Sequence, residues 1–172
     1  HSLVQKTSRK WSTCVGLSPL KPKSGIYKWC VKIETLGRRG HCIFGVATED
    51  VSPNTYLGQD SSGWGLTMNN EIYHSSRSQQ PEKALKLSVN SVLEIVYDSN
   101  ENVLHFTDTA NQAGTISSKI ESGDKTLYPA FSLFSPGDHI VFLSLTEATR
   151  MLESPASHQN LPSTSEKQKI AG

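Results

Sequence analysis

Few side chains of this chain are spaced for covalent chemistry. A serine nucleophile on a strained turn needs Gly-x-Ser-x-Gly, and the nearest approach, Gly16-Leu17-Ser18-Pro19-Leu20, lacks the second glycine. The phosphate-binding patterns GxxxxGK[ST] and GxGxxG do not occur in the sequence. We therefore expect neither serine-hydrolase chemistry nor a phosphate-binding loop.

Metal and glycosidase chemistry also lack their residue patterns. His41 and Cys42 are the nearest pair of metal-ligand types, but adjacent residues of a strand point to opposite faces and cannot share one ion. A glycosidase needs two facing carboxylates. The acids lie mostly in predicted turns, at Asp60, Asp98, Glu101, Asp124 and Asp138. We expect a chain without catalytic residues, metal or cofactor.

The charge of the chain is balanced overall but uneven along its length. Its 172 residues carry 17 lysines and arginines against 16 acids, a formal net charge of +1. The first 40 residues hold nine basic groups and one acid, which leaves the remainder acidic and gives a surface that could steer a charged partner. A basic stripe with interleaved aromatics is confined to Lys6–Trp11, so we expect no nucleic-acid partner.

Cysteine usage indicates a reducing compartment. Cys14, Cys30 and Cys42 form no CxxC pair and are odd in number, whereas small secreted scaffolds use dense, even sets. The sequence holds no Asn-x-Ser/Thr glycosylation site, and no apolar run approaches the ~18 residues of a membrane-spanning helix. We expect an intracellular, cytoplasmic location and no membrane partner.

The elements that must position any site are strands. Apolar and polar residues alternate with a period of two over 27–34, 92–97, 103–107 and 139–145. Turn residues separate the apolar runs at 69–70, 98–102 and 135–138, and only 146–152 has the pattern of a short helix. The pattern predicts an all-β fold, a two-sheet antiparallel β-sandwich with little helix. A closed barrel is the alternative, which the mixed strand lengths disfavour.

The apolar residues stop short of the chain's end. From 148 to 172 the large apolar residues are only Met151, Leu152, Leu161 and Ile170, among serine, threonine, glutamine, proline and lysine. Such a segment cannot bury enough surface to offset its ordering entropy. We predict one sandwich domain over residues 1–147 and a largely disordered tail over residues 148–172.

Four stretches in order resemble the SPRY domain family. They read SGIYKWCV at 24–31, GVAT at 45–48, GWGL at 63–66 followed by EIYH at 71–74, and LYPAF at 127–131. The family is a β-sandwich, and the resemblance covers about residues 8 to 146. It implies a non-catalytic module that binds a protein or peptide through loops at one end of the sandwich. Many such domains recruit substrates in ubiquitin ligases.

The spacing is most similar to the SOCS-box-associated SPRY proteins, which grip an acidic, asparagine-rich peptide. The residues that the resemblance assigns to that grip are replaced here. Gly40 stands at the threonine position, Pro53 or Asn54 at the tyrosine position, and Ser135-Pro136-Gly137 at the late-loop pair, while the early loop has no proline. The resemblance therefore carries over the scaffold and not that peptide specificity.

The resemblance and the strand pattern divide the conspicuous residues into core and candidate contacts. We expect Trp29, Trp64, Tyr73, Tyr128 and Phe131 in the core, and Gly45 and Gly65 where strands need close packing or a bulge. The candidate partner-binding residues are the loop residues Arg9, Lys10, Trp11, Arg38, Arg39, Asn54, Thr55, Tyr56, Ser135 and Asp138. Arginine and aromatic residues lead this set because binding hot spots are enriched in them.

Two other functions stay open at this point. A sandwich could instead be lectin-like or a glycoside hydrolase, which would require a cleft with paired carboxylates. It could also be an intramolecular scaffold domain of a large multidomain protein, whose loops contact their own host. We expect a monomeric module of a larger protein in either binding case.

Overall fold

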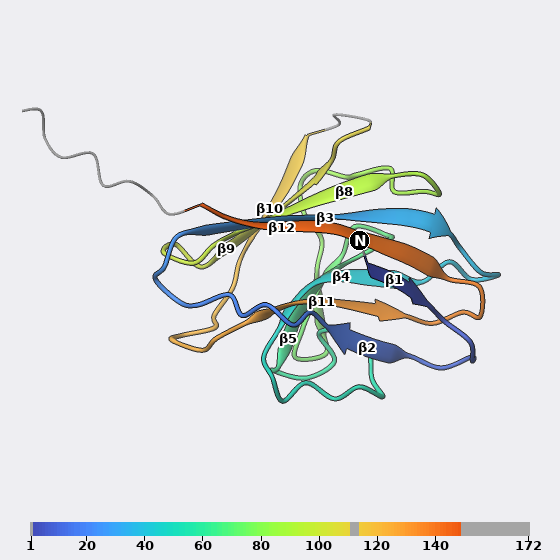
Figure 1. Cartoon of the computed structure of the whole chain (residues 1–172), viewed down its shortest axis with the longest axis horizontal. Helices are drawn as coiled ribbons and strands as arrows, with labels where there is room; N and C mark the ends of the chain where they lie inside the picture. Colours follow the sequence, from blue (N-terminus) through green and yellow to red (C-terminus); the bar gives the residue numbers. More distant parts are fainter. Residues whose placement is uncertain (1, 111–113, 149–172) are drawn as a thin grey trace, which may run out of the picture.

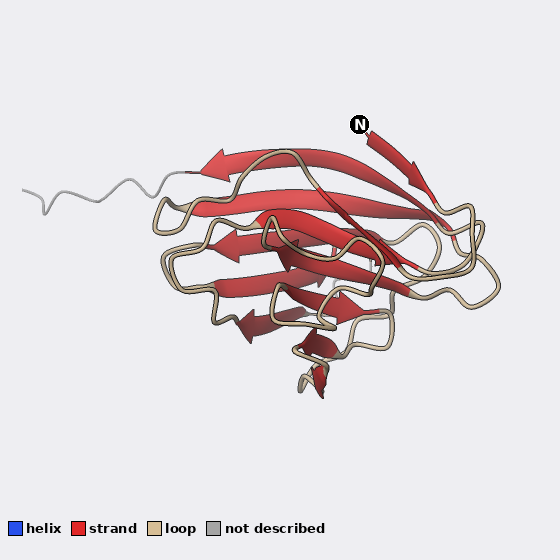
Figure 2. Cartoon of the chain, turned by 90° about the horizontal axis from the view of Figure 1, so that it is seen from below, coloured by secondary structure: helices blue, strands red, loops and turns tan. Residues whose placement is uncertain are grey.

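Twelve strands form two antiparallel sheets in the computed structural model, which describes residues 2–110 and 114–148. The first sheet contains, in spatial order, β1 (Ser2–Gln5), β12 (His139–Ala148), β3 (Ile26–Thr35), β8 (Val92–Asp98), β9 (Val103–Asp108) and β10 (Thr115–Lys119). The second contains β2 (Ser12–Val15), β11 (Tyr128–Leu133), β4 (Cys42–Ala47), β5 (Gly63–Thr67), β6 (Ile72–His74) and β7 (Arg77–Gln79). The sheets lie face to face as two layers (Figures 1 and 2), which confirms the predicted sandwich.

The main core lies between the sheets and follows the period of two. On β3, Tyr27, Trp29, Val31 and Ile33 are each at most 2% exposed, because they alternate inward from a long central strand. Phe44 of β4 and further inward residues of the second sheet complete the same cluster. Burial of these large side chains supplies the main driving force for pairing the sheets.

A second, smaller core lies on the outer face of the second sheet. Ile43 and Ala47 of β4 and Ala130 of β11 are covered there by Leu57, which comes from the loop over residues 48–62. This cover explains why every residue of β4 is buried, although the strand alternates between two faces of the sheet. The loop that covers this face also shapes the site described below.

Glycine at Gly65 permits this close cover. A Cβ atom built at Gly65 would lie 2.5 Å from Cγ2 of Ile43 and 2.9 Å from Cδ2 of Leu57. Real Cβ contacts do not come this close, so a side chain here would push the covering loop off the sheet. The prediction that Gly65 serves close packing is confirmed.

The predicted turns are in place. β5 and β6 are joined by a tight hairpin in which Asn70 has a φ of 65° and its side chain binds both backbone groups of Leu85. The connection from β8 to β9 occupies residues 99–102, and the turn over residues 135–138 leads into β12. Each turn places a polar residue or glycine where the chain reverses.

The end of the last strand differs from what the sequence predicts. The short helix predicted over 146–152 is wrong for Thr146–Ala148, which continue β12 through pairing with Ile26, Tyr27 and Lys28; the rest of that segment lies outside the described residues. β12 runs to Ala148, one residue past the predicted domain boundary, and the remaining tail residues are likewise not described.

Two aromatic residues expected in the core lie partly at the surface. Trp29, Trp64 and Phe131 are buried as predicted, whereas Tyr73 and Tyr128 are half-buried. Tyr73 pairs with Gly65 across the outer face of the second sheet, so its ring faces away from the main core. The prediction of a strand at β6 is confirmed. Which of its two faces packs on the main core was not predicted correctly, because the loop over residues 48–62 covers the face that carries Tyr73.

The contact at Gly65 gives a test of this packing. We expect Gly65→Ala to lower the free energy of unfolding by about 1–3 kcal/mol, because overpacking forces Leu57 and its loop to shift. Urea denaturation followed by tryptophan fluorescence measures the loss. Gly16→Ala is the control, since its Cβ would meet only Pro129 at 3.5 Å, an ordinary contact. Equal stability of both variants would contradict the close cover.

Candidate functional site

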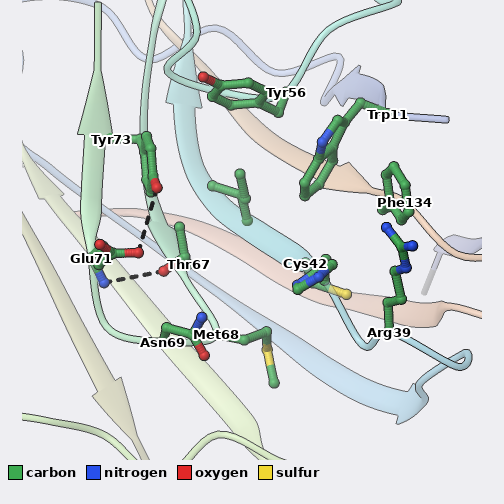
Figure 3. Close-up of a pocket in the computed structure, with 12 residues that line it drawn as sticks. Trp11, Arg39, Cys42, Tyr56, Thr67, Met68, Asn69, Glu71, Tyr73 and Phe134 are labelled. Atoms are coloured by element: carbon green, nitrogen blue, oxygen red, sulfur yellow. Dashed lines mark hydrogen bonds between the residues drawn. The ribbon is translucent and has the colours of Figure 1, made fainter. Parts of the chain in front are cut away.

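An open pocket lies on the outer face of the second sheet beside the covering loop (Figure 3). Its volume is about 390 Å³, in the range of ligand-binding clefts. Ile43, which is 3% exposed, belongs to its lining. Cys42 of β4 also lines the pocket. The remaining lining residues come from the segment before β2, the β3–β4 turn, the covering loop, the β5–β6 hairpin and the residue after β11, so five further segments converge on one hollow.

Aromatic side chains form the walls of this pocket. The ring of Trp11 lies 5.7 Å from that of Tyr56 and 5.2 Å from that of Phe134, measured between centroids. Tyr56 in turn meets Tyr73 edge to face at 5.8 Å. All four rings are half-buried, so each keeps a surface that a ligand can contact. Packed aromatic rings of this kind give large contact area at little entropic cost.

Two side-chain hydrogen bonds join the covering loop to the sheet, and a third links their partners on β2 and β11. The hydroxyl of Thr13 on β2 donates to the carbonyl of Thr55 at 2.6 Å. It therefore accepts from the hydroxyl of Ser132 on β11 at 2.7 Å, and Ser132 itself accepts from the N–H of Leu57 at 2.7 Å. Because Tyr56 lies between Thr55 and Leu57, these bonds hold its backbone in place, and its ring packs against Trp11 and Tyr73.

A second clasp holds the β3–β4 turn, which carries two arginines. The carboxylate of Asp138 accepts the N–H of Gly37 at 2.8 Å through Oδ1, and those of Phe134 and Ser135 at 3.1 and 2.7 Å through Oδ2. The hydroxyl of Ser135 accepts the N–H of Arg39 at 3.3 Å. Bonds to a charged acceptor are about twice as strong as neutral ones, so Asp138 ties the turn firmly to the segment that follows β11.

An arginine surface adjoins the aromatic pocket. Arg9, Arg38 and Arg39 surround a second hollow of about 590 Å³ that shares Arg39 and Phe134 with the first. The guanidinium of Arg39 lies 5.6 Å from the centroid of the Phe134 ring, within cation–π range. The ion pairs of the described residues all join lysines to acids, so they leave the charge of these exposed arginines uncompensated.

A carboxylate marks the other end of the aromatic pocket. The hydroxyl of Tyr73 donates to Oε2 of Glu71 at 3.4 Å, and the backbone N–H of Glu71 donates to the Thr67 hydroxyl (Figure 3). Burial and the charge of Glu71 raise the pKa of Tyr73, so its hydroxyl stays protonated at neutral pH. The pocket thus has an acidic end at Glu71 and a basic end at Arg39.

The structure divides the ten predicted contact residues into two groups. Six of them line the two hollows, namely Arg9, Trp11, Arg38, Arg39, Tyr56 and Ser135. Lys10 and Asn54 are exposed but line neither hollow. The expectation fails for Asp138, which is fully buried and occupied by backbone N–H groups, and Thr55 acts through its carbonyl in anchoring the loop.

Sequence reasoning missed Phe134, Tyr73, Glu71 and His41, which also line the pocket. Phe134 directly follows Leu133, which faces the main core, so strict alternation already placed Phe134 on the outer face. The sequence around Tyr73, Glu71 and His41 gives no comparable signal, because it does not show which part of the outer sheet face is left uncovered by loops. Tyr56 faces the pocket two or three residues after the positions where the resemblance places a tyrosine, Asn54 and Pro53.

In the described part of the chain, no group of three or more histidine, cysteine, aspartate or glutamate side chains gathers as metal ligands. The described residues also include no helix of the length and apolarity that crossing a membrane requires.

Comparison with known proteins identifies relatives of this architecture. The family model described as "SPRY domain" matches residues 26–145. No curated protein matches the chain by sequence. Among solved structures, the SPRY domain of human HERC1 is similar with a TM-score of 0.64 at 18% identity, covering 83% of this chain and 87% of that one. The TRIM65 PSpry domain has a TM-score of 0.62 at 15% identity, covering 78% and 72%.

The loop anchor gives a second testable prediction. Ser132→Ala should lower the free energy of unfolding by about 1–3 kcal/mol, because the buried N–H of Leu57 loses its acceptor. Amide hydrogen exchange should show faster exchange at Leu57 than in the wild type. Ser78→Ala on the exposed strand β7 is the control and should change neither quantity. Unaltered protection at Leu57 would contradict the anchoring role.

The clasp at Asp138 gives a third prediction. Asp138→Asn keeps the shape of the side chain but leaves one oxygen to accept three N–H groups, so stability should fall by about 2 kcal/mol. Thermal unfolding measures the loss. Asp124→Asn is the matched control, because its ion pair with Lys23 is exposed and should contribute little. A similar melting temperature for both variants would argue against the clasp.

Proposed function

The chain belongs to the SPRY domain family, and from this premise we propose that it binds a protein or peptide partner at the aromatic pocket and its arginine surface. SPRY domains are in general non-catalytic interaction modules. The observation that carries the proposal is the juxtaposition of half-buried Trp11 and Tyr56 with the exposed guanidinium of Arg39. Tryptophan, tyrosine and arginine are the residues in which binding hot spots are enriched.

The anchoring of the pocket supports the same proposal. Tyr56 is fixed by the bonds of its neighbours to Thr13 and Ser132, and Arg39 lies on a turn clasped by Asp138. A pre-organised surface loses less conformational entropy on binding than a mobile one, which favours affinity. Except for Ser135, which lines the second hollow and is itself buried, the residues that would touch a partner are distinct from the buried polar residues that hold them in place.

The glycoside-hydrolase alternative fits this pocket poorly. Its lining includes one carboxylate, that of Glu71, whereas the two-carboxylate mechanism needs an acid and a second acid as base or nucleophile. The hydroxyl of Tyr73 already occupies one oxygen of Glu71. A binding role therefore accounts better for the residues present.

The narrower parts of the proposal rest on the family resemblance. We propose that the domain serves as a monomeric part of a larger protein, and that it could present a bound substrate to ubiquitin-ligase machinery. The peptide preference of the SOCS-box-associated SPRY proteins is not part of the proposal, since their binding residues are replaced at Gly40 and at 135–137. A cytoplasmic location, without nucleic-acid or membrane partners, stays a prediction from composition.

Arg39→Glu tests the proposed surface. We expect partner recovery from a cell lysate to fall at least about tenfold, since the charge at the pocket's rim is reversed, as for truncated hot-spot residues. The melting temperature should stay nearly unchanged, because the side chain is exposed. Quantitative mass spectrometry of proteins captured on the immobilised domain measures recovery. Arg77→Glu, on exposed β7 and outside both hollows, is the matched control. Equal recovery by the wild type and Arg39→Glu would remove Arg39 from the site.

A further inference from the structure

The carboxylate of Glu71 faces the pocket without a basic partner among the described residues. Its backbone groups are used in the hairpin with Thr67, and its side chain accepts the hydroxyl of Tyr73 through one oxygen. The ion pairs of the described residues lie elsewhere, at Lys23, Lys28 and Lys32. A half-buried, lone negative charge beside an open hollow attracts a cation from a ligand.

The aromatic walls of the pocket, of which Tyr73 lies next to Glu71 and Trp11 on the opposite side, add to that attraction. The rings of Trp11 and Tyr56 are inclined by 55°, and those of Tyr56 and Tyr73 by 83°, so the three rings bound the hollow from different sides (Figure 3). Aromatic faces attract Lys and Arg side chains within about 6 Å of the ring centroid. We call the space bounded by these three rings the aromatic box. The buried, apolar side chain of Ile43 also lines it, which limits hydration and strengthens the attraction of a cation by the carboxylate and by the rings.

The opposite end of the same pocket has the reverse preference. Arg39 adjoins Arg9 and Arg38 there, and the adjoining hollow has no acidic lining residue. A ligand cation is repelled from this end and an anion is held by it. Arg39 is on the turn before β4, and Glu71 is in the hairpin between β5 and β6. Because β4, β5 and β6 are neighbours, the two ends are roughly 10–15 Å apart.

We infer that the partner is a peptide segment of two opposite charges, with a basic side chain in the aromatic box beside Glu71 and an acidic residue on the arginine surface. This rests on the proposed function and specifies the partner's chemistry. An extended peptide advances about 3.3 Å per residue, so the two residues are separated by roughly three to five positions. The charge arrangement also fixes the direction in which the peptide lies across the sheet.

A random peptide library tests this inference. Ten-residue peptides displayed on phage are selected on the immobilised domain, and those whose binding is lost with Trp11→Leu are taken as pocket ligands. We expect these ligands to share a lysine or arginine followed or preceded, at one fixed spacing, by aspartate or glutamate. Circular dichroism and thermal unfolding establish that Trp11→Leu is folded. Tyr73→Leu provides a second pocket variant if it is not.

One selected peptide, made synthetically, identifies which groups recognise it. Glu71→Gln should weaken binding about fivefold, as expected for a partly exposed ion pair. Tyr56→Phe should bind like the wild type, whereas Tyr56→Leu should bind about three- to tenfold more weakly, because only the latter loses the aromatic face. Glu121→Gln, an exposed carboxylate outside the pocket, is the matched control and should have no effect.

Changes in the peptide complete the test. Replacing its basic residue by norleucine should weaken binding to the wild type but add little loss in Glu71→Gln. Peptides with lysine, trimethyl-lysine or arginine at this position then show which cation fits the box best. Fluorescence polarisation at low and at physiological salt measures each affinity.

Two results would overturn the inference in different ways. Pocket-dependent peptides without the charge pair, or binding that is indifferent to Glu71→Gln and to norleucine, would exclude the charged partner while leaving the proposed binding function intact. A library from which no pocket-dependent peptide is selected, together with unchanged recovery of lysate proteins by Arg39→Glu, would count against the binding function itself.

Discussion

The close cover of the second sheet by the chain's own loop is the constraint on which the site depends. The absence of a side chain at Gly65 lets Leu57 approach the strands, and the hydroxyls of Ser132 and Thr13 tie the loop in place. Only with the loop in this position does the ring of Tyr56 stand beside Trp11 and Tyr73. On this face of the sheet, the same loop contacts therefore determine both the packing of the smaller core and the geometry of the site.

Buried polar groups hold the segments of the site in place, whereas exposed groups on the same segments are available for contact. Asp138 and Ser132 are fully buried and satisfy backbone N–H groups, which would otherwise be costly to bury. Arg39 and Tyr56 sit on the segments so held and keep surface for a partner. A substitution beneath the site should act through stability, and one at its surface through binding.

The fold tolerates wide sequence variation because its core requires only apolar residues at alternate strand positions. Structures 15–18% identical to this chain share its architecture over most of their length. The proposed choice of partner depends instead on exposed side chains, whose identity is not restricted by the packing of the core. The pairing of an acidic end at Glu71 with a basic end at Arg39 is of this second kind, and a fold comparison says nothing about it.

The sequence by itself determined the sandwich, its turns and most of its inner face, since a period of two is a local property that strands such as β3 display openly. It also supplied Trp11, Arg39 and Tyr56 as residues suited to binding. Only the tertiary structure decided that Asp138 lies inside and Tyr73 outside. Those outcomes depend on contacts between distant segments, such as Gly37 with Asp138 and the loop at Leu57 with β11, which no local pattern encodes.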